Sequence, residues 1–107
     1  MRIQSLSYAG HSAVFIKTDS STIAIDPWIN GNPSLPSDFK IPSDLSLIAL
    51  SHGHADHACD SPSLCKEYGA KVAATYELAM IMIKEGVPQQ NVIPLNRGGS
   101  AKVDGID

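Results

Sequence analysis

The sequence predicts one small α/β domain, a mixed sheet with its helices on one face. Its 107 residues allow a single domain. Hydrophobic residues make up 43% and charged residues 18%, which is enough apolar mass for a core and excludes disorder as the main state. Strand-like and helix-like segments alternate in the second half of the chain, a pattern typical of helices packed on a sheet.

Three short strands are predicted near the N-terminus, antiparallel and consecutive. Residues 2–8 alternate imperfectly between polar and apolar, and residues 13–18 are rich in β-forming side chains. The polar connection Asp19-Ser20-Ser21 is short, so residues 13–18 and 22–25 should form a hairpin. Asp26 and the proline after it end the third strand.

A long irregular loop is predicted over residues 27–44, which contain four of the seven prolines. Loops longer than about 12–15 residues in compact domains are often lids or binding loops. Trp28, the only tryptophan, stands at its start. Two roles remain open for this side chain: it caps the core beneath the loop, or it forms the wall of a pocket.

Four more strands are predicted. The nearly continuous apolar run 45–50 indicates a strand buried on both faces. Short strands follow at 71–74 and 92–95, and another begins at 101–103.

Two helices are predicted between these strands. The first covers 61–68, with Ser61 as N-cap and Pro62 at the first helical position. The second covers 76–85. Because residues 78–83 are apolar all round, we expect this helix to be buried on most sides.

Composition excludes several classes of partner. The net charge is −3 and the basic residues are scattered, which argues against a nucleic-acid partner. No stretch approaches the ~18 apolar residues of a membrane span, and the N-terminus lacks a secretory apolar segment. Cys59 and Cys65 are too few for a secreted disulfide scaffold, so we expect free thiols in a cytoplasmic protein and no thiolate zinc site.

The segment after the buried strand concentrates potential metal ligands. His52, His54, Asp56 and His57 lie within six residues. Imidazole and carboxylate groups are ligands that zinc, iron and manganese prefer. His52 and His54 are two apart, so an extended backbone points both to one side, where they can share one ion. Asp56 and His57 follow the bend and can reach a second position. The alternative is an exposed polar loop whose histidines cluster by chance.

The stretch Leu50–His57 resembles the signature of the metallo-β-lactamase superfamily. Ile23–Pro27 resembles the strand of that family that ends in an aspartate. Tyr8–Ile16, with its Gly-His-Ser-Ala sequence, and Asn91–Val103 resemble a subgroup of metal-dependent hydrolases related to L-ascorbate-6-phosphate lactonase. Nuclease branches usually open with a glycine-threonine-glycine pattern, which is absent here, so a nuclease of this superfamily is the less favoured function.

The resemblance implies roles for individual residues. His52 and His54 correspond to ligands of a first metal, and Asp56 and His57 to ligands of a second. Asp26 corresponds to an acidic residue that orients a ligand histidine. The implied cofactor is Zn²⁺, with two ions in the intact protein; Mn²⁺ and Fe²⁺ are alternatives.

Two residues are expected to take part in catalysis. Asp56 is one of them. The other is His11, which corresponds to a histidine near the mouth of the active site, where it would contact substrate or assist a proton. A structural hydrogen bond in a turn is the alternative role for His11.

The resemblance also implies a larger architecture. Members of the superfamily are longer and fold as an αββα sandwich of two similar halves. No histidine follows His57, so residues 1–107 are expected to be an N-terminal half, a partial domain that stops before the second half. The apolar face of such a half-sheet would be exposed and would favour self-association.

The function predicted from these observations is metal-dependent hydrolysis. A metal-activated water would attack a lactone or phosphoester of a small metabolite. This chain alone is expected to lack a complete site. A non-catalytic metal-binding or assembly half-domain is the alternative.

Overall fold

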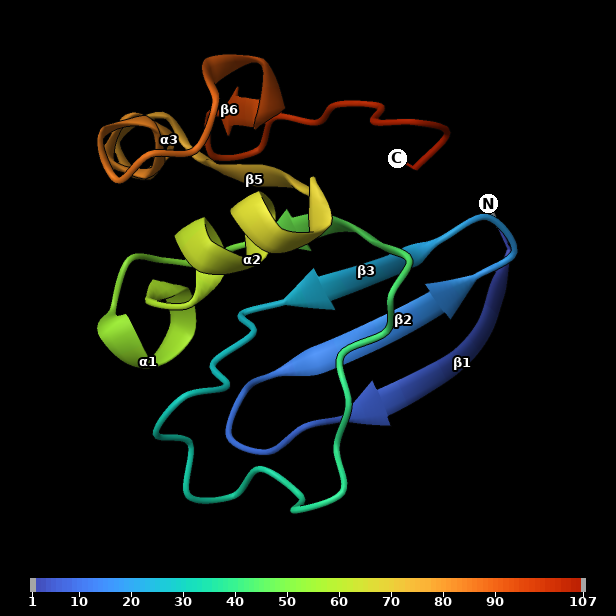
Figure 1. Cartoon of the computed structure of the whole chain (residues 1–107). Coiled ribbons are helices and arrows are strands. Elements are labelled where there is room, and N and C mark those ends of the chain that lie inside the picture. Colours follow the sequence, from blue (N-terminus) through green and yellow to red (C-terminus); the bar gives the residue numbers. More distant parts are fainter. Residues whose placement is uncertain (1, 107) are drawn as a thin grey trace.

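The computed structural model describes residues 2–106 and contains one six-stranded mixed sheet, in which the strands lie in sequence order (Figure 1). The first three strands are antiparallel neighbours, as the sequence predicted, and the third to the sixth are parallel. The strands are β1 (Ile3–Tyr8), β2 (Val14–Thr18), β3 (Thr22–Ile25), β4 (Leu45–Ala49), β5 (Lys71–Thr75) and β6 (Val92–Leu95).

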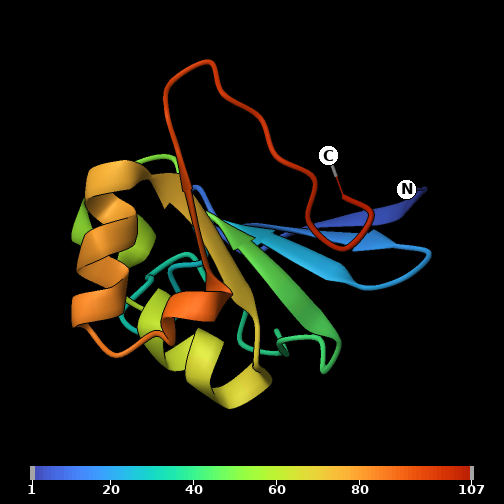
Figure 2. The same ribbon diagram turned by 90° about the horizontal axis from the view of Figure 1, so that it is seen from above.

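The two main helices cover one face of this sheet, which confirms the predicted arrangement (Figure 2). They are α2 (Ser61–Tyr68) and α3 (Tyr76–Lys84); a single turn, α1 (Ala55–Ala58), precedes them, and a 3-10 turn, η1 (Gln89–Asn91), follows. The core between sheet and helices is mostly aliphatic. It is built from Phe15, Ile48 and Val72 on the sheet and from side chains such as Leu64 and Met82 on the helices. None of the helices in residues 2–106 is long and apolar enough to cross a membrane.

The C-terminal segment crosses the other face of the sheet (Figure 2). The prediction of a strand at residues 101–103 is wrong, because Val103 forms only an isolated bridge with Ile106. These two side chains pack on Ile23 and Leu47, so burying apolar surface decides the path of the segment. The expectation of a bare sheet face is therefore corrected: the chain itself covers part of it. A cavity of about 430 Å³ remains between the segment and the sheet.

The edge strand β1 keeps its apolar side chains exposed. Its pairing with β2 is irregular between Ile3 and Ser5, and this irregularity puts Ile3, Leu6 and Tyr8 opposite alternate residues of β2. The exposed fractions of the three side chains are 55%, 67% and 65%. They extend the apolar face that the C-terminal segment covers in part.

Both helix predictions need a correction in detail. Asp60, not Ser61, occupies the N-cap position of α2, and Ser61 Oγ is buried without a hydrogen-bond partner. Helix α3 is not buried on most sides, because only one of its faces meets the sheet. Leu78 and Met82 are buried there, whereas Ile81 is 50% exposed.

Asp44 ties the β2–β3 hairpin to the start of β4. Its carboxylate accepts hydrogen bonds from Lys17 Nζ and, at 2.7 Å, from Thr22 Oγ1. The hydrogen bond from Lys17, and next that from Thr22, lower the pKa of Asp44. Because its pKa is lowered in the folded state, the carboxylate stabilises the fold at pH values above 3.8, the ordinary pKa of this group. This contribution is lost as the pH falls through the lowered pKa.

We therefore expect an Asp44→Asn variant to be less stable than the parent chain at neutral pH. The difference should narrow as the pH falls below 3.8, where the parent carboxylate takes up its proton. Urea unfolding of both proteins at neutral pH and at acidic pH measures this. A difference that is the same at both pH values would contradict the assignment.

Candidate metal centre

The histidine-rich segment leaves the sheet at the carboxyl end of a central strand, as predicted. Strands β3 and β4 are parallel, and Ile25 pairs with Ala49, so the residues after both strands emerge at the same edge. Asp26 follows β3 directly, and its N–H donates to the carbonyl of Ala49 at 3.1 Å. This register brings Asp26 beside a segment that is distant in sequence.

Asp26 holds the segment through three hydrogen bonds. Its Oδ1 accepts from Ser51 N at 2.8 Å, and its Oδ2 accepts from Ser51 Oγ at 2.6 Å. His57 Nδ1 lies 3.1 Å from the same Oδ2. The Asp26 side chain is buried, and its φ of 45° belongs to the left-handed region that Asp tolerates better than most residues. The prediction that Asp26 lies close to a motif histidine is confirmed.

These bonds decide which ring nitrogens are free. A carboxylate only accepts, so His57 donates from Nδ1 and keeps the lone pair on Nε2. Ser51 spends its single hydroxyl proton on Asp26, so His52 Nδ1, 2.8 Å from Ser51 Oγ, is also the donor. A neutral ring at either position therefore carries its lone pair on Nε2, the form in which imidazole binds a metal.

A second pair lies on the other side of His57. His11 Nε2 is 3.2 Å from Asp56 Oδ2, and Asp56 Oδ1 is 3.7 Å from His57 Nε2. The His11 ring meets the His57 ring edge-on at 5.1 Å. His11 takes a left-handed φ of 58°, and its carbonyl accepts a hydrogen bond from Tyr8 Oη at 2.6 Å. A turn from the N-terminal sheet edge thus brings a histidine into contact with the motif.

Within residues 2–106, two overlapping groups have donor atoms close enough to hold a metal ion. One is His11, Asp56 and His57, and the other is Asp26, His52 and His57; in each, the donor atoms lie within 4.8 Å of one another. Nitrogen and oxygen donors of this kind suit zinc, iron and manganese. The residues therefore fit a divalent metal.

The predicted sharing of ligands between two ions stays a prediction. His54 lies outside both groups, although its ring meets the His52 ring edge-on at 4.7 Å. The rings of His52 and His57, assigned to different ions by the resemblance, are 4.0 Å apart. His57 thus stands at the centre of the cluster.

Sequence reasoning missed Ser51. Its only signal was its place beside His52, and a serine next to a histidine is too common to carry a role. In the structure, the Ser51 hydroxyl forms a hydrogen-bonded relay: it bonds to the Asp26 carboxylate on one side and to His52 Nδ1 on the other.

We expect Ser51→Ala to weaken Zn²⁺ binding by about 10-fold, the lower end of the range for partners that orient a ligand histidine. The methyl group cannot accept the His52 Nδ1 proton, so the ring is free to rotate. Competition with a chromogenic chelator measures the affinity. Ser51→Thr retains the hydroxyl and serves as the control; equal losses in both variants would contradict the relay.

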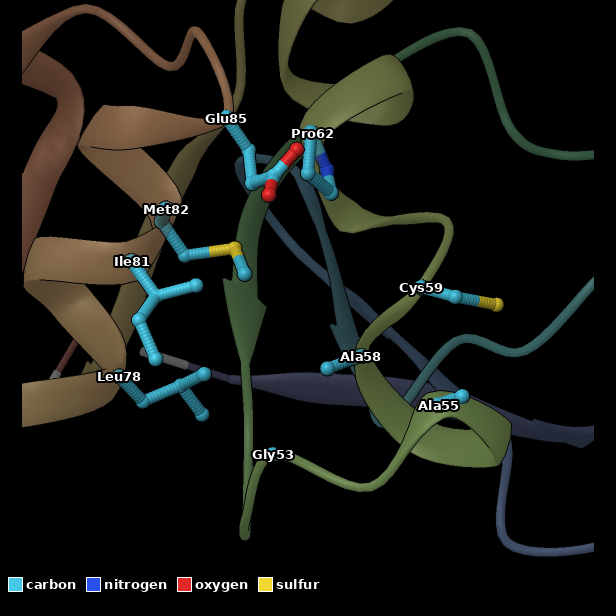
Figure 3. A pocket seen from close by; sticks show the side chains of 9 residues that line it. All are labelled: Gly53, Ala55, Ala58, Cys59, Pro62, Leu78, Ile81, Met82 and Glu85. Atoms are coloured by element: carbon cyan, nitrogen blue, oxygen red, sulfur yellow. The ribbon is translucent and has the colours of Figure 1, made fainter.

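A largely apolar groove lies beside the motif segment, between α1, the start of α2 and α3 (Figure 3). It encloses about 370 Å³, and none of the motif's imidazoles lines it. Leu78, Ile81 and Met82 reach into it from α3 (Figure 3). The groove is therefore separate from the cluster of metal-binding groups. The lining residues are Gly53, Ala55, Ala58, Cys59, Pro62, Leu78, Ile81, Met82 and Glu85.

Both cysteines are free thiols, as predicted. Burial raises the pKa of Cys65 to about 11. Burial, and next the neighbouring Asp60, also raise the pKa of Cys59. Neither thiol is predisposed to ionise and bind a metal.

Comparison with known proteins places these observations in a family. Residues 8–106 match the family model of the metallo-beta-lactamase superfamily. A UPF0173 metal-dependent hydrolase of Rubrobacter xylanophilus is 35% identical over 102 residues, 94% of this chain and 41% of the relative. One of Anoxybacillus flavithermus is 44% identical over 100 residues, 92% of this chain and 42% of the relative. The chain thus spans about two fifths of the length of these relatives.

Solved structures agree on the fold. Igni18, a metallo hydrolase from Ignicoccus hospitalis, has a TM-score of 0.73 and 32% identity, covering 94% of this chain and 43% of that one. CmlA, a diiron beta-hydroxylase from Streptomyces venezuelae, has a TM-score of 0.68 at 20% identity over 85% of this chain and 20% of that one, which shows a likeness of fold alone. The mixed sheet with helices on one face corresponds to half of the metallo-beta-lactamase fold, and the chain belongs to the metallo-beta-lactamase superfamily.

Proposed function

We propose that this chain supplies metal-binding residues of a metal-dependent hydrolase. The observation that carries the proposal is that Asp26 holds the Nδ1 atom of His57 directly and that of His52 through Ser51, which leaves Nε2 of each ring for a metal. The names of the relatives from Rubrobacter xylanophilus and Anoxybacillus flavithermus support it. The favoured metal is Zn²⁺, with two ions in the intact protein, and Mn²⁺ or Fe²⁺ as alternatives.

The residues divide into those that would hold the metal and those that act beside it. His52, His54, Asp56 and His57 would hold it. A bound divalent ion lowers the pKa of water to about 7 and polarises a carbonyl or phosphoryl oxygen. His11 Nε2 lies 3.2 Å from Asp56 Oδ2, and Asp56 Oδ1 lies 3.7 Å from His57 Nε2.

We infer that these two side chains would carry the proton transfers of the hydrolysis. Asp56 would accept the proton of the attacking water, and His11 would deliver a proton to the oxygen that leaves. The new bond joins the water oxygen to the carbonyl carbon or phosphorus, and the bond to the leaving oxygen breaks.

The proposed substrate is a lactone or phosphoester of a small metabolite. The Gly10–Ala13 stretch, which resembles the lactonase-related subgroup, places His11 at the metal-binding cluster. The net charge of −3 disfavours a polyanionic nucleic acid. We place the reaction in the cytoplasm, where the two free thiols would stay reduced.

The test compares this chain with an extended chain, in which it is followed by the part of the Anoxybacillus flavithermus relative that lies beyond the match. Zn²⁺ affinity is measured by chelator competition, and turnover with bis(p-nitrophenyl) phosphate and δ-valerolactone. We expect weak binding and little turnover from the 107 residues alone. The extended chain should bind tightly and turn over one of the probes, and a chelator or His54→Ala should remove that activity.

Two outcomes would overturn the proposal. Turnover of the extended chain that resists the chelator would exclude metal-dependent hydrolysis. Tight metal binding with no turnover of either probe would favour the alternative, a non-catalytic metal-binding half-domain.

We also propose that the chain self-associates through the apolar sheet face next to β1. Leu6 is 67% exposed there, and removing such surface from water is favourable. The sedimentation coefficient should rise with concentration for the parent chain and not for Leu6→Asp. Ser5→Asp places the same charge on the neighbouring, oppositely directed residue of β1 and should leave association unchanged. A parent chain that stays monomeric would contradict this.

A further inference from the structure

We propose that Asp60 is a positioning residue that fixes the start of the 27–44 loop, so that Trp28 forms a wall beside the metal-binding cluster. The wall would face the apolar, non-reacting part of the substrate. That second statement rests on the proposed hydrolase function, whereas the positioning by Asp60 stands on contacts within the chain.

Asp60 is buried, yet its side chain does not cap the helix that it precedes. Its Oδ2 accepts hydrogen bonds from Ile29 N at 2.7 Å and from Asn30 N at 3.0 Å. Its Oδ1 accepts from Asn30 Nδ2 at 2.9 Å. Hydrogen bonds to a carboxylate are about twice as strong as neutral ones, so this side chain anchors the loop firmly.

The anchored residues hold Trp28 in turn. Its Nε1 donates to Asn30 O at 2.8 Å, and its ring meets the His11 ring edge-on at 5.1 Å. Because Asn30 takes the only N–H of the indole, the ring has no hydrogen-bond donor left for a ligand. An apolar part of a molecule is therefore the chemistry that this surface suits.

Trp28 does not serve as the cap of the core. Other loop residues pack against the helix-side core instead, among them Ile29, Leu35, Phe39 and Ile41. Of the two roles that the sequence left open for Trp28, the contacts favour the pocket wall.

The contacts form one path from the motif to the wall and back. Asp60 lies three residues after His57, so it moves with the segment that carries the motif. It fixes Asn30, Asn30 fixes Trp28, and Trp28 packs on His11, which pairs with Asp56. Release of Asp60 should therefore displace Trp28 while the Asp26 hydrogen bonds remain.

The carboxylate of Asp60 and the amide of Asn30 can be exchanged between the two positions by substitution. Asp60→Asn removes the charge that strengthens the hydrogen bonds from Ile29 N and Asn30 N, and Asn30→Asp sets two carboxylates against each other. The double variant restores one amide and one carboxylate with their positions reversed. Asp38→Asn, an exposed change in the same loop, is the matched control.

Trp28 is the only tryptophan, so its fluorescence reports on this wall alone. We expect acrylamide quenching of Trp28 to rise about threefold in each single variant. In the double variant it should return to the parent level, because substitutions of residues in direct contact are not additive. Added Co²⁺ should quench the parent fluorescence and quench both single variants less. If a single variant does not fold, recovery of the parent fluorescence in the double variant also shows that Asp60 and Asn30 act as a pair.

Parent-like quenching in both single variants would overturn the proposal, as would a double variant that is no better than either. These measurements need no turnover, so they separate a failure of the positioning from a failure of the hydrolase function.

The wall itself is tested with two substrates in the extended chain. Trp28→Ala should raise KM for bis(p-nitrophenyl) phosphate more than KM for methyl p-nitrophenyl phosphate, whereas any fall in kcat caused by the lost contact with His11 should be equal for the two substrates. An equal rise in KM for the two substrates would exclude Trp28 as a wall for the apolar part.

Discussion

Replacing His57 by alanine should weaken Zn²⁺ binding by at least about 100-fold, the upper end of the range known for partners of ligand histidines. His57 is the one side chain shared by the two groups of donor atoms, so its removal leaves neither group with three. His11→Ala and His52→Ala each dismantle only one group and should cost less. Chelator competition on the three variants measures the order of the effects.

A control is needed because His57 also bonds to the buried Asp26. His57→Asn offers an amide N–H in place of Nδ1–H and has no counterpart of Nε2. It should keep the fold, judged by circular dichroism, and still lose the metal. Zn²⁺ affinity in His57→Asn that equals the parent value would show that Nε2 is not a ligand.

Replacing Asp26 by alanine should lower the free energy of unfolding by about 3 kcal/mol or more. Ser51 N, Ser51 Oγ and His57 Nδ1 all lose their acceptor. Alanine is also disfavoured at a φ of 45°, by about 1 kcal/mol. Urea unfolding in the presence of a chelator measures the change without any contribution from bound metal.

Asp26→Asn separates stability from metal binding. Asparagine tolerates the same backbone conformation and keeps one acceptor oxygen, so the loss of stability should be smaller. It carries no charge to hold the two rings, so Zn²⁺ affinity should still fall by about 10–100-fold. A variant that loses stability but binds Zn²⁺ normally would show that Asp26 supports the fold alone.

The parts of the molecule that were predictable from sequence are those with local signals. The apolar run 45–50 indicated a buried strand, and the ligand types that follow it indicated a metal site at the strand's end. The polar connection at residues 19–21 indicated the hairpin, which Thr18 closes by accepting hydrogen bonds from Ser20 N and Ser21 N. Each of these patterns acts over a few neighbouring residues.

The parts that were not predictable depend on contacts between distant segments. The contact of His11 with Asp56 requires the whole register of the sheet. Asp60 looked like one acid among several, and its role follows from the fold of a loop that begins 33 residues earlier, at Pro27. The path of Val103 over the second face depends on apolar surface that only the assembled sheet presents.

The hydrogen bonds of the Asp26 carboxylate determine whether the metal-binding side chains become ordered during folding or during metal binding. In small zinc domains the ion creates the fold, and the apoprotein is unfolded. Here the chain's own hydrogen bonds orient two imidazoles, so part of the entropy of ordering them is lost during folding rather than during metal uptake. We therefore expect the protein to stay folded when a chelator removes its metal.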